Sequence, residues 1–322
     1  MKVFVTGGAG FIGSNLVDRL MDAGHFVTVI DNFSGGRADF LQRHFGSGRF
    51  RLVEGDVRDT DRVVRELDPE TDLVFHLAAN ADIARGVDDP TLDFDHSLVA
   101  TFSVLQAMRE RGLRRIFYTS GSGVYGDRGL AYSPESHGPL LPVSMYGATK
   151  LGAEGLISAF VALFAMQAWI VRPANIIGPR ATHGVVFDFV RRLRADPTTL
   201  KILGDGKQSK AYLHVDDVIN AMLLIVKKAK SKINIYNLSS NSFITVNEIA
   251  RLVISSMKLG RVKIARSANK VGWKGDVAIV RLRSSRLKAL GWKPKHTSAQ
   301  AVRATVEALL EDARNASSAA AP

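Results

Sequence analysis

Short apolar runs alternate with helix-length segments through the first half of the chain. The apolar runs have the length of strands and read "KVFVT", "FVTVI", "FRLVEG", "DLVFHLAA", "RRIFYTS" and "AWIVRP". The segments between them predict helices over about 11–23, 37–44, 59–68, 91–112 and 146–166. This alternation is typical of repeated β-α-β units, whose parallel sheet is covered by helices on both faces. We therefore expect an α/β fold with a doubly wound parallel sheet.

The pattern changes after Pro173, where turn-rich segments divide the chain into shorter elements. These segments read "GPRATHG", "ADPTT", "LGDGKQSK" and "SSNS". We expect residues 1–174 to form the first lobe, and residues 175–207 and 241–314 to form a smaller mixed α/β lobe that binds substrate. A long helix near 215–229 and the strand "INIYNLSS" predict that residues 208–240 return to the first sheet. Residues 315–322, "NASSAAAP", have no periodic pattern, which predicts a loose tail.

The amino-acid composition limits the kinds of functional site that the protein can contain. The chain has 322 residues, of which 46% are hydrophobic, and this is enough for a sizeable core. The absence of cysteine excludes disulfides, thiolate catalysis and Cys-ligated zinc, and no metal site is predicted. The first predicted strand begins at residue 2, which leaves no room for a secretory signal, so we expect a cytoplasmic protein. The longest apolar stretch, 155–171, is interrupted by Ser158 and Gln167, and it predicts a buried helix followed by a strand, not a membrane span.

The formal net charge of +12 indicates an anionic partner. A phosphorylated substrate, a nucleic acid and an acidic membrane surface all satisfy this condition. The clusters Arg191, Arg192 and Arg194 and Lys227 to Lys232 lie at helical spacing near acidic residues, without interleaved aromatic residues. We interpret them as solvated helix faces and predict no nucleic-acid partner.

A glycine-rich turn follows the first predicted strand. Gly7, Gly10 and Gly13 lie between "KVFVT" and a helical segment, where glycines permit a tight turn and a close approach of backbone N–H groups to a pyrophosphate. The helix N-terminus adds partial positive charge. Asp31 ends the next strand, and its carboxylate suits the ribose hydroxyls while it repels a 2′-phosphate. These features predict a Rossmann-type site for NAD and not NADP.

The ends of two further strands extend this site. Asp56 in "EGDVRD" ends the third strand-like run, where it can meet the adenine amino group. Leu77, Ala78 and Ala79 in "FHLAAN" end the fourth run, and their small size allows a cofactor to lie close over the sheet. The carboxyl ends of neighbouring strands are where open α/β sheets bind ligands.

Tyr146 and Lys150 in "YGATK" are four residues apart at the start of a predicted helix, so both side chains project from one face. A phenol has a pKa of about 10 and is a poor base at neutral pH. A nearby ammonium and a positively charged nicotinamide would both stabilise the phenolate. The pair therefore predicts a tyrosine base, with Lys150 also able to hold the nicotinamide ribose.

An ordered set of motifs along nearly the whole chain carries a family resemblance. The motifs are "TGGAGFIGS", "DNFSGGR", "GDVRD", "HLAA", "VYGD", "YGATK", "RPANIIGPR", "LGDGKQSKAYLHVDD", "GWKGDV" and "LGWKP". The chain resembles the extended short-chain dehydrogenase/reductases, and within them the nucleotide-sugar epimerases of the UDP-galactose 4-epimerase type. The resemblance implies NAD-dependent inversion at C4 of a UDP-hexose or UDP-N-acetylhexosamine through a 4-keto intermediate, with Tyr146 as the base. It also implies a homodimer that pairs through the two long helices near 91–112 and 146–166.

The resemblance implies further site residues. At the cofactor these are Phe11, Ile12, Asn32, Ser34, Gly35, Val57 and Ser97, and at the substrate Asn175, Val185, Lys201, Leu203, Lys210, Trp273 and Asp276. Three of them depart from the family pattern. Lys210 and Trp273 stand at or near arginines that many relatives use for phosphates, and Ser97 replaces a frequent asparagine. A lysine lacks the bidentate fork of arginine, so diphosphate recognition is expected to differ.

One catalytic hydroxyl of the family is missing. Relatives carry serine or threonine four residues before the tyrosine of "VYG", and this chain has Gly121 there. Ser120 and Ser122 carry hydroxyls, but in an extended segment they point away from the face that residue 121 uses. We favour a glycine-rich kink that brings Ser122 or Ser120 into place. A water in the gap, or an impaired protein, stays open.

Two other functions are weighed against the epimerase. Nucleotide-sugar 4,6-dehydratases resemble this chain but carry an Asp-Glu pair just before "VYG", where this sequence has Ser122 and Gly123. Elimination therefore lacks its acid and base, and this function ranks below the epimerase. An NAD-binding sensor or scaffold with weak or no turnover is the other alternative, because Gly121 replaces the expected hydroxyl.

Overall fold

The first lobe is built on a parallel sheet. In this computed structural model, which describes residues 1–80, 82–267, 272 and 275–319, the sheet has seven strands in the order β10-β6-β5-β4-β1-β2-β3. Their bounds are β1 (Lys2–Thr6), β2 (Phe26–Asp31), β3 (Phe50–Glu54), β4 (Leu73–His76), β5 (Arg115–Thr119), β6 (Gln167–Pro173) and β10 (Ile233–Leu238). The order reverses between β1 and β4, which opens a crevice at the carboxyl ends of the strands. The predicted doubly wound, Rossmann-type sheet is confirmed.

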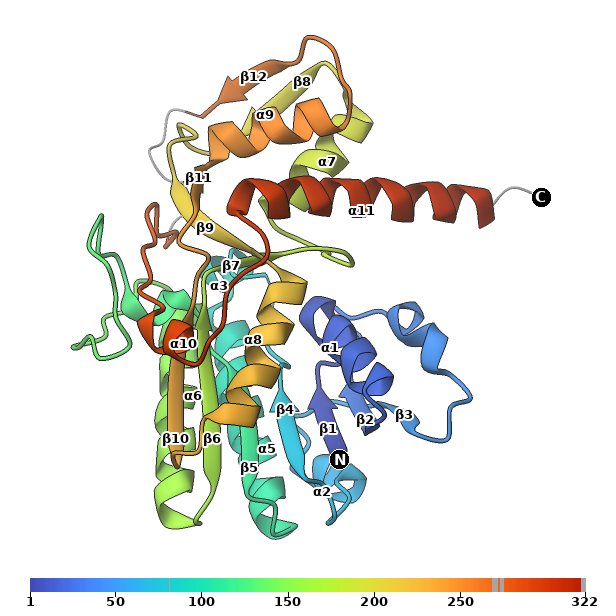
Figure 1. Ribbon diagram of the computed structural model, residues 1–322, viewed down its shortest axis with the longest axis vertical. Helices are drawn as coiled ribbons and strands as arrows, with labels where there is room; N and C mark the ends of the chain where they lie inside the picture. The colour runs from blue at the N-terminus through green and yellow to red at the C-terminus, as the bar shows by residue number, and fades with distance from the viewer. Residues whose placement is uncertain (81, 268–271, 273–274, 320–322) are drawn as a thin grey trace.

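Helices cover both faces of this sheet (Figure 1). On one face lie α1 (Phe11–Asp22) and α8 (Val215–Lys228), and on the other α2 (Thr60–Glu66), α5 (Ala100–Glu110) and α6 (Met145–Leu163). Side chains alternate between these two cores along each strand: Val3 and Val5 pack under α1 and α8, whereas Phe4 packs under α2, α5 and α6. Burial of both faces explains why the strands are continuous apolar runs.

The helices differ locally from the predicted ones. The segment predicted over 37–44 is a 3₁₀ helix, η1 (Ala38–His44). The segment predicted over 91–112 follows the short α3 (Arg85–Asp88) and consists of α4 (Pro90–Asp93), a π-helical turn η2 (Phe94–Val99) and α5. The apolar stretch 155–171 is the end of α6 followed by β6, as expected. Over the part of the chain that the structure describes, none of the helices is both long and apolar enough to span a bilayer.

The second lobe is smaller and mixed. A three-stranded sheet contains β11 (Phe243–Thr245), β9 (Ser209–His214) and β7 (Asn175–Ile177), and a two-stranded sheet pairs β12 (Lys263–Arg266) with β8 (Thr199–Ile202). The helices α7 (Val185–Ala195), α9 (Val246–Ser256) and α11 (Ser298–Ala319) pack with these strands.

Three boundaries differ from the predicted ones. Because β9 pairs with β7 and β11, the chain returns to the first lobe at Val215 and not at residue 208. Leu287 of α10 (Ser285–Ala289) and Trp292 pack into the first-lobe core, so part of the segment 241–314 belongs to that lobe. The expected loose tail is helical up to Ala319, since α11 continues through it.

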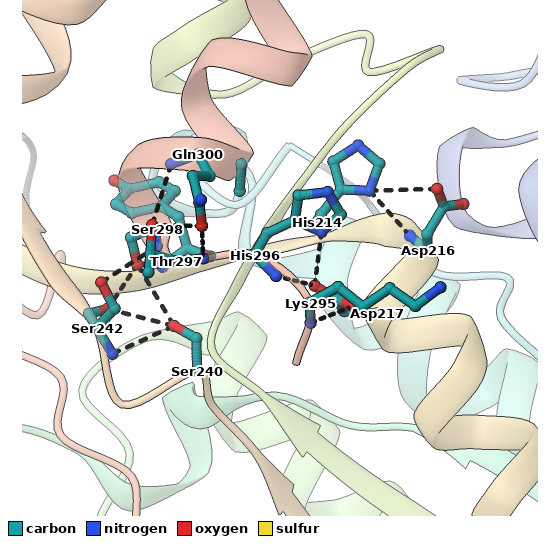
Figure 2. A network of polar contacts seen from close by, with 12 residues as sticks. His214, Asp216, Asp217, Ser240, Ser242, Lys295, His296, Thr297, Ser298 and Gln300 are labelled. Carbon is teal, nitrogen blue, oxygen red and sulfur yellow. Dashed lines mark hydrogen bonds and ion pairs between the residues drawn. The ribbon is translucent and has the colours of Figure 1, made fainter. Parts of the chain in front are cut away.

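A buried carboxylate ties the two lobes together (Figure 2). Asp217, near the start of α8, is 1% exposed and accepts hydrogen bonds from the backbone N–H groups of Lys295 (2.9 Å) and His296 (3.1 Å). His296 Nδ1 lies 2.9 Å from the same carboxylate. This carboxylate therefore holds the chain between α10 and α11 against the junction of β9 and α8.

Candidate active site

A cavity of about 800 Å³ lies where the carboxyl ends of the first-lobe strands meet the second lobe. Its walls come from the loops after β1, β2, β3, β4 and β5, from the start of α6, and from β7, α7 and β9. The volume is within the range of cofactor and substrate pockets.

Close backbone contacts require glycine at two positions of the turn after β1. Gly7 has a φ of +68°, and a Cβ there would lie 2.7 Å from the backbone nitrogen of Ala78. A Cβ on Gly13 would lie 2.7 Å from the Cα of Gly8. Gly10 is the N-cap of α1 and has no side chain to cap it, so the first N–H groups of the helix stay available to an anion. The turn therefore fits a dinucleotide pyrophosphate.

The two predicted acids have different surroundings. Asp31 is 7% exposed, and its two oxygens accept hydrogen bonds from the N–H groups of Ala9 and Phe33, each at 2.9 Å. Burial raises the pKa of Asp31, while these two bonds oppose the shift. Asp56 forms an ion pair with Arg58 at 2.8 Å, and hydrogen bonding to Arg58 lowers its pKa to about 2. Asp31 is thus positioned by the backbone, whereas Asp56 already has a side-chain partner.

The predicted cofactor residues gather along the cavity with one exception. Those that line it are Gly7, Gly10, Phe11, Ile12, Gly13, Asp31, Asn32, Ser34, Gly35, Asp56, Val57, Leu77, Ala78, Ala79, Tyr146 and Lys150. Ser97 lies in the π-helical turn η2, is 1% exposed, and is outside this lining.

Tyr146 and Lys150 come from the first turns of α6, which is fixed by two local features. Ser144 caps the helix by accepting the N–H of Gly147 at 3.1 Å. A Cβ on Gly147 would lie 2.6 Å from the carbonyl oxygen of Gly123, so glycine lets α6 pack on the 3₁₀ turn η3 (Ser122–Tyr125). This contact brings Tyr146 beside the end of β5.

Burial is the main cause of the pKa shifts of Tyr146 and Lys150. Lys150 is 3% exposed, its Nζ donates to the carbonyl oxygen of Thr119 at 2.9 Å, and it lies 5.7 Å from the centroid of the Tyr146 ring. Burial lowers the pKa of Lys150 to about 8, against the attraction of Asp93 and Glu154. Burial also raises the pKa of Tyr146 to about 12, and Asp93 adds to this. The protein's own groups therefore keep the phenol protonated at neutral pH, and Lys150 alone does not produce the expected lowering of its pKa.

Residue 121 faces the tyrosine, as the resemblance implies. Its backbone is extended (φ −169°, ψ 165°), and a Cβ there would lie 3.4 Å from Tyr146 Oη. The chain then turns at once into η3, which begins with Ser122. Ser120 and Ser122 both line the cavity, and the buried Oγ of Ser120 has no hydrogen-bond partner among the described residues. Two hydroxyls are thus close to the position that Gly121 leaves empty.

A buried polar network supports this region from behind. Arg172 on β6 pairs with Glu154 on α6 through two hydrogen bonds of 2.9 and 2.5 Å. Arg172 also donates to the hydroxyl of Tyr125 at 2.9 Å, and that hydroxyl donates to Asn237 Oδ1 at 2.8 Å. The network therefore connects η3 and α6 with the strands β6 and β10.

The predicted substrate residues divide into three groups. Asn175, Val185, Leu203, Lys210 and Asp276 line the cavity. Lys210 Nζ lies 2.6 Å from Asp276 Oδ1, so an acid already balances its charge. Lys201 is exposed on β8 and is outside the lining, and Trp273 lies outside the described residues.

Some cavity residues were not identified from the sequence. Arg191 and Arg192, expected on a solvated helix face, line the cavity because α7 starts at its rim after Gly184, whose φ is +97°. Gln208, directly before β9, and Tyr212, within β9, also line it. Gln208 lies inside the quoted motif "LGDGKQSKAYLHVDD", which was the available signal for it.

Comparison with known proteins decides the family. The family described as "NAD dependent epimerase/dehydratase family" matches residues 3–239. The chain belongs to this family. Among curated relatives of this epimerase/dehydratase, a UDP-glucose 4-epimerase of Mycolicibacterium smegmatis is 34% identical, covering 95% of this chain and 98% of the relative.

Solved structures agree with this assignment. A UDP-galactose 4-epimerase is 36% identical with a TM-score of 0.87, covering 97% of this epimerase/dehydratase and 99% of its own chain. A dTDP-glucose 4,6-dehydratase from Streptomyces venezuelae, solved with NAD, is 27% identical with a TM-score of 0.89, covering 97% and 98%. The predicted family, the predicted NAD cofactor and an NAD-dependent epimerase class of enzyme are confirmed.

Proposed function

We propose that this protein interconverts the C4 epimers of a UDP-sugar through a 4-keto intermediate. The observation that carries the proposal is the convergence of Tyr146, Lys150 and the glycine turn of the NAD site on one cavity. The similarity to UDP-glucose and UDP-galactose 4-epimerases supports the substrate class.

Each residue has a defined role in this proposal. NAD bound at this site would supply the hydride acceptor for C4, and its positive charge would favour the phenolate of Tyr146. Tyr146 Oη takes the proton of the 4-hydroxyl and returns it to the opposite epimer. Lys150 contributes an ammonium that favours the phenolate over the neutral phenol, against the effect of burial. Asp31 and the N–H groups at the start of α1 hold the ribose and the pyrophosphate.

Ser122 or Ser120 supplies the hydroxyl that Gly121 lacks. The turn that starts at Ser122 and the unpartnered Oγ of Ser120 support this assignment within the described residues. The hydroxyl would hydrogen-bond to the oxygen at C4 and steady it for proton transfer to Tyr146. Ser122 is the favoured residue, since it begins a turn directly after the extended Gly121.

The dehydratase alternative receives less support. The similarity to a dTDP-glucose 4,6-dehydratase favours it, but elimination needs an acid and a base at the positions of Ser122 and Gly123. A serine and a glycine offer neither at neutral pH. If the protein formed a 4-keto-6-deoxy product from a nucleotide hexose, the dehydratase function would replace the epimerase proposal.

One assay tests the function directly. In each reaction the protein is incubated with NAD and one UDP-sugar: UDP-glucose, UDP-N-acetylglucosamine or UDP-glucuronic acid. The C4 epimers in each reaction are then separated and quantified. We expect interconversion of at least one pair, and a loss of about 10²–10⁴-fold in Tyr146→Phe because the base is gone. Tyr236→Phe is the matched control, since Tyr236 lies on β10 outside the cavity lining. Wild-type rates in Tyr146→Phe would contradict the mechanism, and NAD binding without turnover would favour the sensor.

We also propose a homodimer formed through α5 and α6. Phe102 on α5 and Leu163 on α6 are large apolar side chains that are 44% and 73% exposed. Burial of these side chains against a second copy would remove that apolar surface from water. Size-exclusion chromatography with light scattering tests the proposal, and a monomer across the micromolar range would contradict it.

A further inference from the structure

The second lobe carries a group of exposed cations that no acid balances. Residues 249–275 contain seven lysines and arginines and no aspartate or glutamate. Four exposed cations of this segment and one of β8, together called the basic tip, are Lys201, Lys258, Arg261, Lys263 and Arg266. None of these five forms an ion pair with another residue that the structure describes. Part of the formal net charge of +12 is therefore unpaired and gathered on one lobe.

The two-stranded sheet turns one of its faces to solvent. In the parallel register of β12 with β8, Leu200 lies beside Ile264, and both side chains pack into the core of the second lobe. Because side chains alternate along a strand, Lys201 and Lys263 project from the opposite face. Both lysines are exposed, so this face is open to a partner.

The chain on either side of β12 extends this charge. Lys258 and Arg261 lie in the connection from α9 to β12, directly before Lys263. Arg266 ends β12, and its guanidinium donates to the Oδ1 of Asn247 at 3.0 and 2.9 Å. An amide oxygen carries no net charge, so this contact positions Arg266 without neutralising it.

Two acids flank β8, and both are engaged by their own turns. Asp196 Oδ1 accepts the N–H and the hydroxyl of Thr198 at 2.9 and 2.6 Å. Asp205 Oδ1 accepts the N–H of Lys207 at 2.8 Å. Neither carboxylate forms an ion pair with the basic tip, which therefore keeps its positive charge for an external partner.

The basic tip lies at one end of the long axis of the molecule. Figure 1 shows β8, β12 and α9 at the top of the view, above the parallel sheet of the first lobe. Among the described residues of 247–267, none lines the cavity, and Lys201 is outside the lining as well. A flat partner can therefore contact the tip while the cavity remains open.

The surroundings of these cations favour a lipid surface over a nucleic acid. Residues 196–207 and 246–267 contain no aromatic side chain, so unpaired bases have no ring on which to stack. Reading a duplex requires an element that enters a groove, whereas Lys201 and Lys263 lie on the outer face of a sheet whose strands have four residues each. An anionic bilayer requires only several exposed cations within reach of its surface.

We propose that the basic tip docks this protein onto an anionic lipid surface. The contact is peripheral and electrostatic: the lysine and arginine head groups meet lipid phosphates, and no segment enters the bilayer. This role is separate from the reaction in the cavity, so it does not rest on the proposed function. A second copy of the chain is a poorer partner for the tip, because two tips placed together repel each other.

The test is flotation of the full-length protein with lipid vesicles. One set of vesicles is pure phosphatidylcholine, and the other contains about 30% phosphatidylglycerol, which supplies the anionic head groups. We expect the wild type to float with the anionic vesicles at about 50 mM salt and to be released at about 300 mM, because salt screens the attraction. It should not float with neutral vesicles.

A triple variant locates the contact. Lys258→Gln, Arg261→Gln and Lys263→Gln together should weaken partitioning onto the anionic vesicles by about 100-fold, since each cation at the surface contributes about fivefold. The matched control removes the same charge from three exposed lysines near the end of α8 and the start of β10, through Lys227→Gln, Lys230→Gln and Lys232→Gln. The control should stay within about threefold of the wild type, because these lysines lie at the other end of the molecule (Figure 1).

Several results would overturn this inference. An equal loss in the control variant would show that binding follows net charge and not the basic tip. Equal flotation with neutral and anionic vesicles, or none with either, would also contradict the proposal, and this comparison uses the wild type alone. If the wild type instead bound a DNA duplex of about 20 base pairs and ignored both vesicles, the partner would be a nucleic acid. Circular dichroism of both triple variants shows that the substitutions leave the fold intact.

Discussion

Burial of the Lys150 ammonium predicts a pH-dependent stability that a single substitution should remove. Lys150 is 3% exposed, and burial lowers its pKa from 10.5 to about 8. Between these two values the unfolded chain binds more protons at this site than the native protein. The free energy of unfolding therefore rises with pH in this window. The destabilisation caused by burying the charged ammonium is fully present below about pH 8.

The magnitude follows from the two pKa values. The difference between 10.5 and about 8 corresponds to roughly 3 kcal/mol against the native state at pH 7. About 2 kcal/mol of this is relieved between pH 7 and pH 9.5. Lys150→Met removes the charge and also the hydrogen bond to Thr119, which contributes about 1 kcal/mol. The variant should then be more stable than the wild type by about 2 kcal/mol at pH 7, nearly equal at pH 9.5, and inactive.

Urea unfolding at pH 7 and pH 9.5, followed by circular dichroism, measures both effects. Other titrating groups are common to the two proteins, so the difference between the wild type and Lys150→Met isolates this lysine. Lys232→Met is the matched control, because Lys232 is exposed, and it should keep the wild-type pH dependence. The same change in stability with pH in the wild type and Lys150→Met would refute the reasoning.

Three further predictions concern the end of β5 and the polar network behind it. Gly121→Ser should keep or raise the turnover, because its backbone is extended and an added Cβ would lie at van der Waals distance, 3.4 Å, from Tyr146 Oη; a tenfold loss would contradict this. Ser122→Ala should lower turnover by about tenfold through one lost hydrogen bond, whereas full activity in the Ser120→Ala, Ser122→Ala double variant would assign the role to water. Glu154→Ala should cost about 3–5 kcal/mol in urea unfolding, because it leaves a buried arginine unpaired, while Glu154→Leu combined with Arg172→Met should recover most of it. An additive loss in that double variant would argue against a coupled pair.

The sequence by itself determined the sheet and the glycine turn, and it predicted the candidate catalytic pair Tyr146 and Lys150. These features depend on short-range rules: strands buried on both faces are apolar throughout, and the close contact of Gly13 with Gly8 excludes a Cβ. The spacing of Tyr146 and Lys150 is likewise a property of one helix. Such patterns are visible wherever the interacting residues are close along the chain.

Only the tertiary structure decided which polar groups already have partners. Lys210 pairs with Asp276, 66 residues away, and the buried Asp217 holds His296, 79 residues away. The pKa of Tyr146, raised to about 12, likewise arises from burial by distant segments. Burial and long-range pairing depend on how the lobes pack, and no periodicity along the chain encodes them. For that reason the sequence predicts where this cavity lies, and the folded structure decides which charges and hydrogen-bonding groups in it remain available to a substrate.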